Sequence, residues 1–283
     1  MEKLTIGDFT FHWLREGLFQ VDGGSMFGVV PKAIWSKRYP YDEKNRIPLR
    51  CDPILLQAEN KNILIEGGVG RGKFNERQKH IYGVREEALI EKSLENLGLE
   101  LEDIDIIALS HMHFDHIAGT SRYKNDQLVP TYPNADIYVS KTEWHEAKNP
   151  HKRSINTYRK KNWRPINHQV VTFQEETEII PGVRIIHTGG HTKGHCILTF
   201  ESKGEKAVYL GDLMGTFAHL NPYWVQAFDD YPMDSIETKE KWLEIILKEN
   251  WWIMFYHDTI YRAAKIDQEG NLIEKIKMQK KNM

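Results

Sequence analysis

Six consecutive residues, from His111 to His116, constrain this chain more than any other feature of its sequence. They read His-Met-His-Phe-Asp-His and directly follow the apolar run IDIIALS, which is typical of a buried strand. His111 and His113 are two positions apart, so in extended backbone their side chains lie on one face and can share one metal ion. Asp115 and His116 follow as the chain turns, and they can serve a second ion beside the first. A chance match to this pattern is expected roughly once in a thousand such chains.

Three further residues of ligand type follow other apolar runs. His191 comes after VRIIHT and two glycines, Asp212 after KAVYLG, and His257 after WWIMFY. Ligands on open α/β sheets tend to bind at the ends of strands, and glycine lets the backbone bend sharply there. An isolated histidine or aspartate at a strand end is more often a surface or capping residue. Together with the six-residue motif, however, these three predict a site of seven ligands.

The other histidines receive a plainer interpretation. His187 and His195 flank His191 in sequence and are candidates for hydrogen bonds to the ligands. The remaining ones are expected on the surface, namely His12, His80, His145, His151 and His168.

Imidazole and carboxylate ligands suit two divalent ions, with zinc expected first and cobalt, manganese or iron(II) as alternatives. Two such ions bring four positive charges, while Asp115, Asp212 and a bridging hydroxide bring three negative ones. A site of this charge can supply hydroxide at neutral pH and stabilise an oxyanion. The sequence therefore favours a hydrolase that needs no serine or cysteine nucleophile.

Strands and helices alternate along the chain without a linker-like break, so we expect one α/β domain over residues 1–283. Helices are predicted within REEALIEKSLENLG (85–98), TEWHEAK after Ser140, and SIETKEKWLEIILKEN, where Ser235 is the predicted N-cap. A single strand is expected at LTIGDFTFHWL (4–14) and a closing hairpin around Gly270. Residues 20–50 are expected to form a long, functional loop.

Composition excludes several classes of protein. The net charge of −2 disfavours a nucleic-acid partner, and no apolar run is long enough to span a membrane. The N-terminus lacks the apolar region of a signal peptide, which predicts a cytoplasmic protein. The only two cysteines, Cys51 and Cys196, are far apart and are expected to be buried apolar residues rather than a disulfide or a thiolate zinc site.

With HxHxDH, then GHT, then GD, then a late histidine, the chain resembles the metallo-β-lactamase superfamily over essentially its whole length. The resemblance implies a four-layer αββα sandwich. It also implies that His111, His113 and His191 hold one metal, that Asp115, His116 and His257 hold the other, and that Asp212 bridges them. Asp115 and Asp212 are the implied catalytic residues, with Asp115 passing a proton to the leaving alkoxide.

Two loop segments, DGGSMFGVVPKAIWSK and GDLMGTFAHLNPYWVQAFDDYP, resemble the YtnP-like quorum-quenching lactonases. That likeness implies opening of N-acyl-homoserine lactones by a metal-bridging hydroxide, and a homodimer is a further expectation from such relatives. The aromatic residues of these segments predict an acyl pocket, with Phe27, His219 and Tyr223 as substrate-binding residues, although core packing explains each aromatic equally well. Alternatives are a glyoxalase II-type thioesterase, a phosphotriesterase of the methyl-parathion-hydrolase type, and a metal-binding protein without turnover.

The chain departs from these relatives at two positions. Many relatives have an aspartate where this chain has Glu66, and that aspartate orients a metal-bound histidine. The better-studied lactonases have a tyrosine near the substrate carbonyl at the position of Gly215. Tyr223 or His219 is a candidate to replace that tyrosine.

Overall fold

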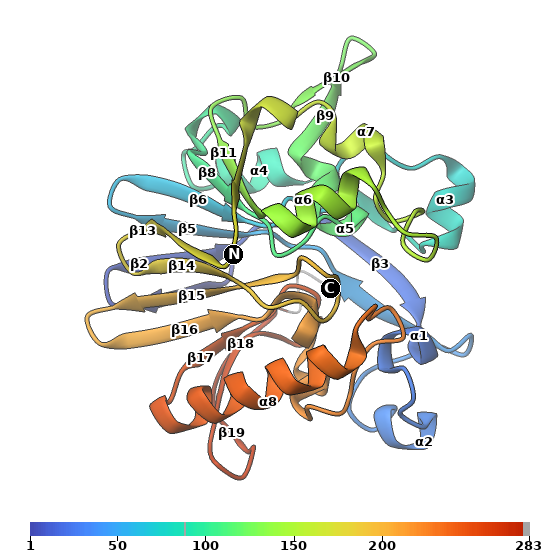
Figure 1. The fold of residues 1–283 in the computed structure, drawn as a ribbon, viewed down its shortest axis with the longest axis vertical. Helices are drawn as coiled ribbons and strands as arrows, with labels where there is room; N and C mark the ends of the chain where they lie inside the picture. Colours follow the sequence, from blue (N-terminus) through green and yellow to red (C-terminus); the bar gives the residue numbers. More distant parts are fainter. Residues whose placement is uncertain (88, 280–283) are drawn as a thin grey trace.

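Two seven-stranded sheets form the centre of the computed structural model, which describes residues 1–87 and 89–279 (Figure 1). The first sheet consists of β1 (Lys3–Ile6), β2 (Phe9–Trp13), β5 (Ile54–Ala58), β6 (Lys61–Ile65), β8 (Ile106–Ala108), β11 (Asp136–Ser140) and β12 (Val170–Phe173), in that spatial order. The second consists of β13 (Glu176–Ile180), β14 (Val183–His187), β15 (Cys196–Ser202), β16 (Glu205–Tyr209), β17 (Trp252–Met254), β18 (Tyr261–Ile266) and β19 (Leu272–Lys277), also in spatial order.

Smaller elements surround the two sheets. Further strands form a three-stranded sheet of β4 (Arg46–Arg50), β3 (Gly17–Asp22) and β7 (Glu86–Glu87), and a hairpin of β9 (Ser121–Lys124) and β10 (Gln127–Pro130). The α-helices are α1 (Gly23–Phe27), α2 (Lys32–Trp35), α3 (Glu76–Ile81), α4 (Ile90–Glu95), α5 (Phe114–Ile117), α6 (Lys141–Lys148), α7 (Lys160–Trp163) and α8 (Pro232–Glu249). Short 3₁₀ turns are η1 (Leu101–Asp103), η2 (Ala118–Thr120), η3 (Asn167–Gln169), η4 (Gly211–Met214) and η5 (Phe217–Leu220).

Successive side chains along the strands of the first sheet point alternately into two hydrophobic cores. Ile54 and Leu56 of β5 belong to the core between the sheets, whereas Leu55 packs with Ile90 and Leu94 of α4. Because successive strand residues point to opposite faces, one strand can fill both cores only if both of its faces are covered. This requirement explains the uninterrupted apolar runs that distinguish these strands in the sequence.

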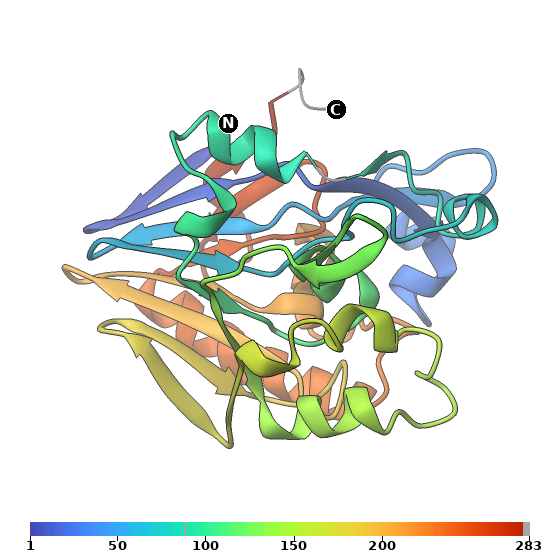
Figure 2. The same ribbon diagram turned by 90° about the horizontal axis from the view of Figure 1, so that it is seen from above.

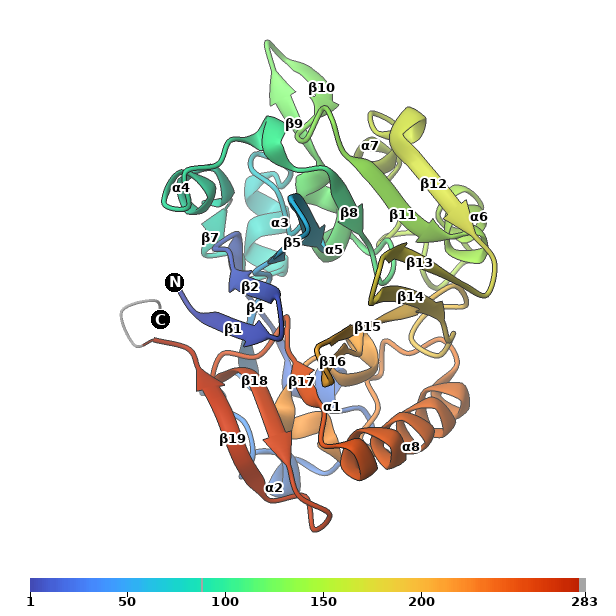
Figure 3. The same cartoon turned by 90° about the vertical axis from the view of Figure 1, so that its left-hand side faces the viewer.

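The second sheet is built in the same way. Phe200 of β15 meets Phe11 of the first sheet edge to face, with ring centroids 5.0 Å apart, while Ile197 packs with Trp242 and Ile246 of α8. Figure 3 shows α8 outside the second sheet and α4 and α6 outside the first. The predicted αββα layering is therefore confirmed.

Some predicted elements differ in detail. The predicted strand over 4–14 is a hairpin, because Gly7 adopts a φ of +52° and turns the chain between β1 and β2. Helix α8 starts with Pro232 in its first turn, so Ser235 lies inside the helix and is not its N-cap. The helix predicted after Ser140 is confirmed as α6, and Ser140 is its N-cap, since Ser140 Oγ accepts from Glu143 N at 3.0 Å.

Two regions differ from their predicted secondary structure. Residues 20–50, predicted as a loop, contain the second half of β3, both α1 and α2, and β4. The predicted helix over 85–98 is shorter, comprising only α4, and follows strand β7; Ala88 lies outside the described residues. Strands β18 and β19 form the predicted closing hairpin.

The short helices α1, α2 and α3 lie on the same side of the molecule, at the right in Figures 1 and 2, with α3 above α1 and α2 in Figure 1. Several strands of both sheets deliver their following residues toward this side. β6 and β8 run parallel in the first sheet, and β16 and β17 run parallel in the second. Within the described residues, no helix has the length and apolar character needed to cross a lipid bilayer.

Candidate metal centre

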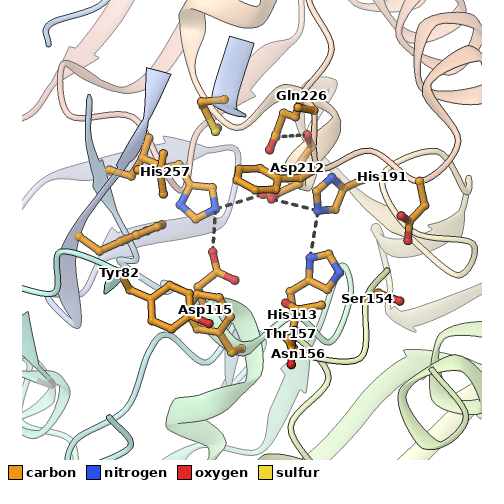
Figure 4. Close-up of a pocket in the computed structure, with 18 of the residues that line it drawn as sticks. Tyr82, His113, Asp115, Ser154, Asn156, Thr157, His191, Asp212, Gln226 and His257 are labelled. Atoms are coloured by element: carbon orange, nitrogen blue, oxygen red, sulfur yellow. Dashed lines mark hydrogen bonds and ion pairs between the residues drawn. The ribbon is translucent and has the colours of Figure 1, made fainter. Parts of the chain in front are cut away.

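The seven predicted ligands lie together where strands of both sheets end (Figure 4 labels five of them). The segment after β8 supplies His111, His113, Asp115 and His116, the last two within α5. Three single ligands follow strands of the second sheet: His191 comes after β14, Asp212 lies in η4 after β16, and His257 comes after β17. The first sheet thus contributes four of the seven predicted ligands and the second sheet contributes three.

One part of the cluster is a set of three imidazoles. His111, His113 and His191 present ring nitrogens that all lie within 4.8 Å of one another. His191 Nε2 and His113 Nδ1 face each other at 3.1 Å. Their ring planes are nearly perpendicular, at 71–79° to one another, as three ligands around a common point would be.

The other part combines imidazoles with carboxylates around Asp212. His257 Nε2 lies 3.1 Å and His116 Nε2 3.3 Å from Asp212 Oδ1. Asp115 Oδ2 lies 3.7 Å from His257 Nε2 and 3.8 Å from His116 Nε2. The second oxygen of Asp212, Oδ2, lies 3.3 Å from His191 Nε2. Asp212 therefore turns one oxygen to each ligand set.

Four of the imidazoles have a polar partner at Nδ1, which leaves Nε2 facing the cluster; three of these contacts are hydrogen bonds and the fourth, at His116, is an ion-pair contact. Asp229 Oδ1 lies 2.7 Å from Nδ1 of His191, and Ser110 Oγ lies 2.9 Å from Nδ1 of His111. His257 Nδ1 donates to the Arg50 carbonyl at 2.7 Å, and His116 Nδ1 lies 3.3 Å from Glu66 Oε2. Such contacts fix the tautomer and orientation of a metal-binding imidazole.

Burial and neighbouring charges shift the pKa values of the ionisable side chains in the cluster. Burial alone would raise the pKa of Asp212, but His257, His116 and His191 hold it well below its usual value. Burial would likewise lower the pKa of His116, but Asp212, Glu66 and Asp115 raise it well above the ordinary value. Burial, reinforced by neighbouring histidines, holds the pKa values of His111 and His113 well below normal. These two imidazoles are neutral at pH 7, which is the form that binds metal.

Buried polar atoms in the cluster test whether it fits metal ions. Among the described residues, His111 Nε2 and Asp212 Oδ1 are buried and have no hydrogen-bond partner. Such atoms are costly unless something else satisfies them. Two ligand atoms at about 2.0–2.1 Å from one tetrahedral ion lie about 3.3 Å apart, close to the 3.1–3.3 Å separations around Asp212. The donor set and its spacing therefore fit divalent metal ions.

A cavity of about 280 Å³ opens above the ligands. Its lining combines apolar and polar side chains. Figure 4 shows the predicted ligands with Tyr82 on one side of them and Ser154, Asn156 and Thr157 on the other. The apolar lining is Phe19, Val21, Met26, Leu49, Tyr82, Phe114 and Phe228. The polar lining includes Arg153, Ser154, Asn156, Thr157, Gln226 and Asp230.

Comparison with known proteins agrees with this geometry. The family model described as the metallo-beta-lactamase superfamily matches residues 46–257, which is most of the chain. The chain belongs to the metallo-β-lactamase superfamily. The predicted class of enzyme, a metal-dependent hydrolase, is thereby confirmed, and the six-residue motif at 111–116 lies within the matched residues.

Individual proteins resemble this chain over most of its length. An N-acyl homoserine lactonase from a Bacillus species is 28% identical over 226 residues, covering 75% of this chain and 82% of the relative. A crystal structure of a probable metal-dependent hydrolase from Staphylococcus aureus is 42% identical, with a TM-score of 0.94, and covers 98% of this chain and 99% of that one. The fold is also that of AidC, a dizinc quorum-quenching lactonase, at a TM-score of 0.79, 20% identity and coverage of 98% and 97%.

The three residues predicted to bind substrate do not line the cavity. Phe27 is fully buried and stacks on His219, with ring centroids 4.8 Å apart. Both ring nitrogens of His219 are engaged, by Thr216 Oγ1 and by the carbonyl of Met26. Tyr223 is 61% exposed and lies away from the cavity. Phe27 and His219 thus support the wall from behind, through their neighbour Met26.

Sequence patterns also miss residues that orient the site. Asp229 and the Arg50 carbonyl each hold a ligand imidazole, yet neither belongs to a recognisable motif. Glu66 reaches His116 despite its extra methylene, and it also accepts from Tyr209 Oη at 3.0 Å. His195 accepts from the Asp212 backbone N–H at 3.2 Å, whereas the His187 ring bonds to the Lys193 carbonyl at 2.9 Å.

The cysteines are both free and fully buried, as predicted. Cys51 lies within 4.8 Å of ligand atoms of Asp115 and His257. Burial, together with the Asp115 and Asp52 carboxylates, raises the pKa of its thiol well above normal.

We expect Asp229→Ala to weaken metal binding about 10- to 100-fold, because His191 loses the partner that fixes its ring. Isothermal titration of metal-free protein with zinc measures the change. Asp234→Asn, at an exposed acidic residue in the first turn of α8, is the control and should bind like the wild type. Unchanged affinity in Asp229→Ala would show that packing alone orients His191.

Proposed function

We propose that this protein hydrolyses the lactone ring of N-acyl-homoserine lactones with two divalent metal ions, most readily zinc. The observation that carries the proposal is the position of Asp212, whose two carboxylate oxygens face two separate ligand sets beneath one cavity. The first set is His111, His113 and His191, and the second is Asp115, His116 and His257. The lactonase names of the Bacillus relatives support the choice of substrate.

Two divalent ions held here would lower the pKa of a water molecule and stabilise negative charge on a carbonyl oxygen. The chain's own residues then have defined tasks. Asp212 keeps the two ligand sets at a fixed separation, and its main chain is held by Gln226 Nε2 and His195 Nε2 at 2.7 and 3.2 Å. Asp115 lines the cavity, and we assign it the proton transfer: it would take a proton from the attacking water and give it to the ring oxygen as the bond between that oxygen and the carbonyl carbon breaks. Addition of one water thus yields a carboxylate and a free hydroxyl.

The cavity supports an acylated substrate rather than a bare ring. Its polar side, with Asn156 and Thr157, suits an amide, and its apolar side suits an alkyl chain. A cavity of about 280 Å³ is close to the lower bound for small-molecule pockets, about 300 Å³. A longer chain would therefore continue along Phe228, which is 44% exposed at the mouth.

A hydrolysis screen on metal-quantified protein tests the proposal. The substrates are N-acyl-homoserine lactones of increasing chain length, a thioester, a phosphotriester and a phosphodiester. We expect the lactones to give the largest kcat/KM, rising with chain length until the cavity is filled. Preferred cleavage of the thioester or the phosphotriester would overturn the lactone assignment while leaving the metal centre intact.

A further inference from the structure

A cluster of three aromatic rings around one arginine forms part of the apolar wall. The Arg159 guanidinium carbon lies 4.8 Å from the ring centroid of Phe114, 5.0 Å from that of Phe74 and 5.1 Å from that of Tyr82. The rings also contact one another, with centroids 4.7–5.9 Å apart. Tyr82 and Phe114 line the cavity, whereas Phe74 and Arg159 lie behind them.

The guanidinium of Arg159 has no ion-pair partner among residues 1–87 and 89–279. The faces and edges of the three rings are therefore its main interaction, and arginine stacks well in such a setting because its cation is planar and weakly hydrated. Its position is fixed by its neighbour Tyr158, whose hydroxyl donates to Glu143 Oε1 at 2.8 Å. The same Glu143 oxygen accepts from Met112 N, between the two ligands His111 and His113.

Two members of this cluster flank helix α3. None of the helix's own residues, Glu76–Ile81, is buried. Phe74 precedes the helix and Tyr82 follows it, and both pack into the cluster. The backbone carbonyls of Lys73 and Tyr82 accept from Lys161 Nζ and Gln20 N. The remaining ring, Phe114, directly precedes Asp115.

We propose that Arg159 is a positioning residue for the apolar wall, holding Tyr82 and Phe114 where a substrate's alkyl chain lies and holding α3 against the side of the cavity. The identity of that chain as an acyl group rests on the proposed function. The positioning of Tyr82, Phe114 and α3 by Arg159 does not depend on that function.

Three variants test the proposal. Arg159→Met keeps the aliphatic stem and removes the cation, Arg159→Lys keeps the cation without its planar group, and Arg164→Met changes an exposed arginine at the other end of α7 as the control. We expect Arg159→Met to lower kcat/KM for N-decanoyl-homoserine lactone about tenfold, mainly through KM. Turnover of γ-caprolactone, which has no acyl chain, should stay within twofold, and so should the metal content. Arg159→Lys should recover part of the loss, and Arg164→Met should match the wild type.

Hydrogen exchange provides a measurement that does not depend on the substrate. Amides of residues 74–82 should exchange faster in Arg159→Met than in the wild type or in Arg164→Met. Unchanged exchange would overturn the proposal, and so would an equal loss on both lactones accompanied by loss of metal. If the wild type opens no lactone, the proposed function fails, but the exchange experiment still decides the role of Arg159.

Discussion

Replacing Asp212 by asparagine is expected to lower lactone hydrolysis by about 10³-fold, while the protein remains folded and melts near the wild-type temperature. The carboxylate faces His116 and His257 through Oδ1 and His191 through Oδ2, so it is the single side chain common to both ligand sets. An amide of the same shape removes the negative charge and can offer only one oxygen.

The fold should tolerate this change because the contacts that hold η4 use the main chain of residue 212. Its carbonyl accepts from Gln226 and its N–H donates to His195, and neither bond needs the carboxylate. Circular dichroism and metal analysis on the same sample separate loss of chemistry from loss of fold. Near-wild-type turnover with two metals still bound would contradict the bridging role.

Removal of the metals is expected to abolish hydrolysis and to lower the melting temperature by about 8 °C or more. A ligand present at a thousandfold excess over its Kd stabilises the native state by about 4 kcal/mol, and 1 kcal/mol corresponds to about 2–4 °C in a protein approaching this size. Without metals, the cluster also leaves His111 Nε2 and Asp212 Oδ1 buried without hydrogen-bond partners from the described residues.

Thermal melts before and after dialysis against a chelator measure this effect. Adding back zinc should restore both the melting temperature and the activity. Magnesium should restore neither, because it prefers oxygen ligands and keeps several of its waters. A chelated protein shown to be metal-free that melts like the untreated protein would contradict the assignment of these residues as ligands.

The sequence predicts the location of the cluster well because strand ends are visible in it. Apolar runs mark strands that are covered on both faces, and the ligand-type residues that follow them must meet once parallel strands are aligned. The same reasoning fails for Asp229, which lies in the irregular segment before α8 and does not follow a strand in the sequence. Only the folded chain brings it within 2.7 Å of His191.

The sequence does not show which aromatic residues line the cavity and which lie behind the lining. Phe19 and Phe27 lie close together in the sequence, yet Phe19 lines the cavity while Phe27 does not line it and lies near the rings of His219 and Trp35, nearly parallel to both. The residues that do line the apolar side come from separate segments, for example Leu49, Tyr82 and Phe228. Their convergence is a tertiary property without a local pattern, and so is the Arg159 cluster.

Some helix boundaries could not be predicted from the sequence for a similar reason. Ser235 has the chemistry of an N-cap, but Pro232 begins α8 three residues earlier, and Ser235 is fully buried inside the helix. Residues 20–50 lack a long periodic pattern because α1 and α2 are only five and four residues long. Packing against neighbouring segments decides such short elements, so propensity alone does not reveal them.

A reconstitution titration shows whether the seven residues hold two metal ions that act together. Metal-free protein is titrated with zinc while hydrolysis of N-hexanoyl-homoserine lactone is followed at each added equivalent. We expect full activity to require two equivalents per chain, and Asp212→Asn to stay about 10³-fold below the wild type at every ratio. Full activity at one equivalent, or activity in the metal-free protein, would contradict this expectation.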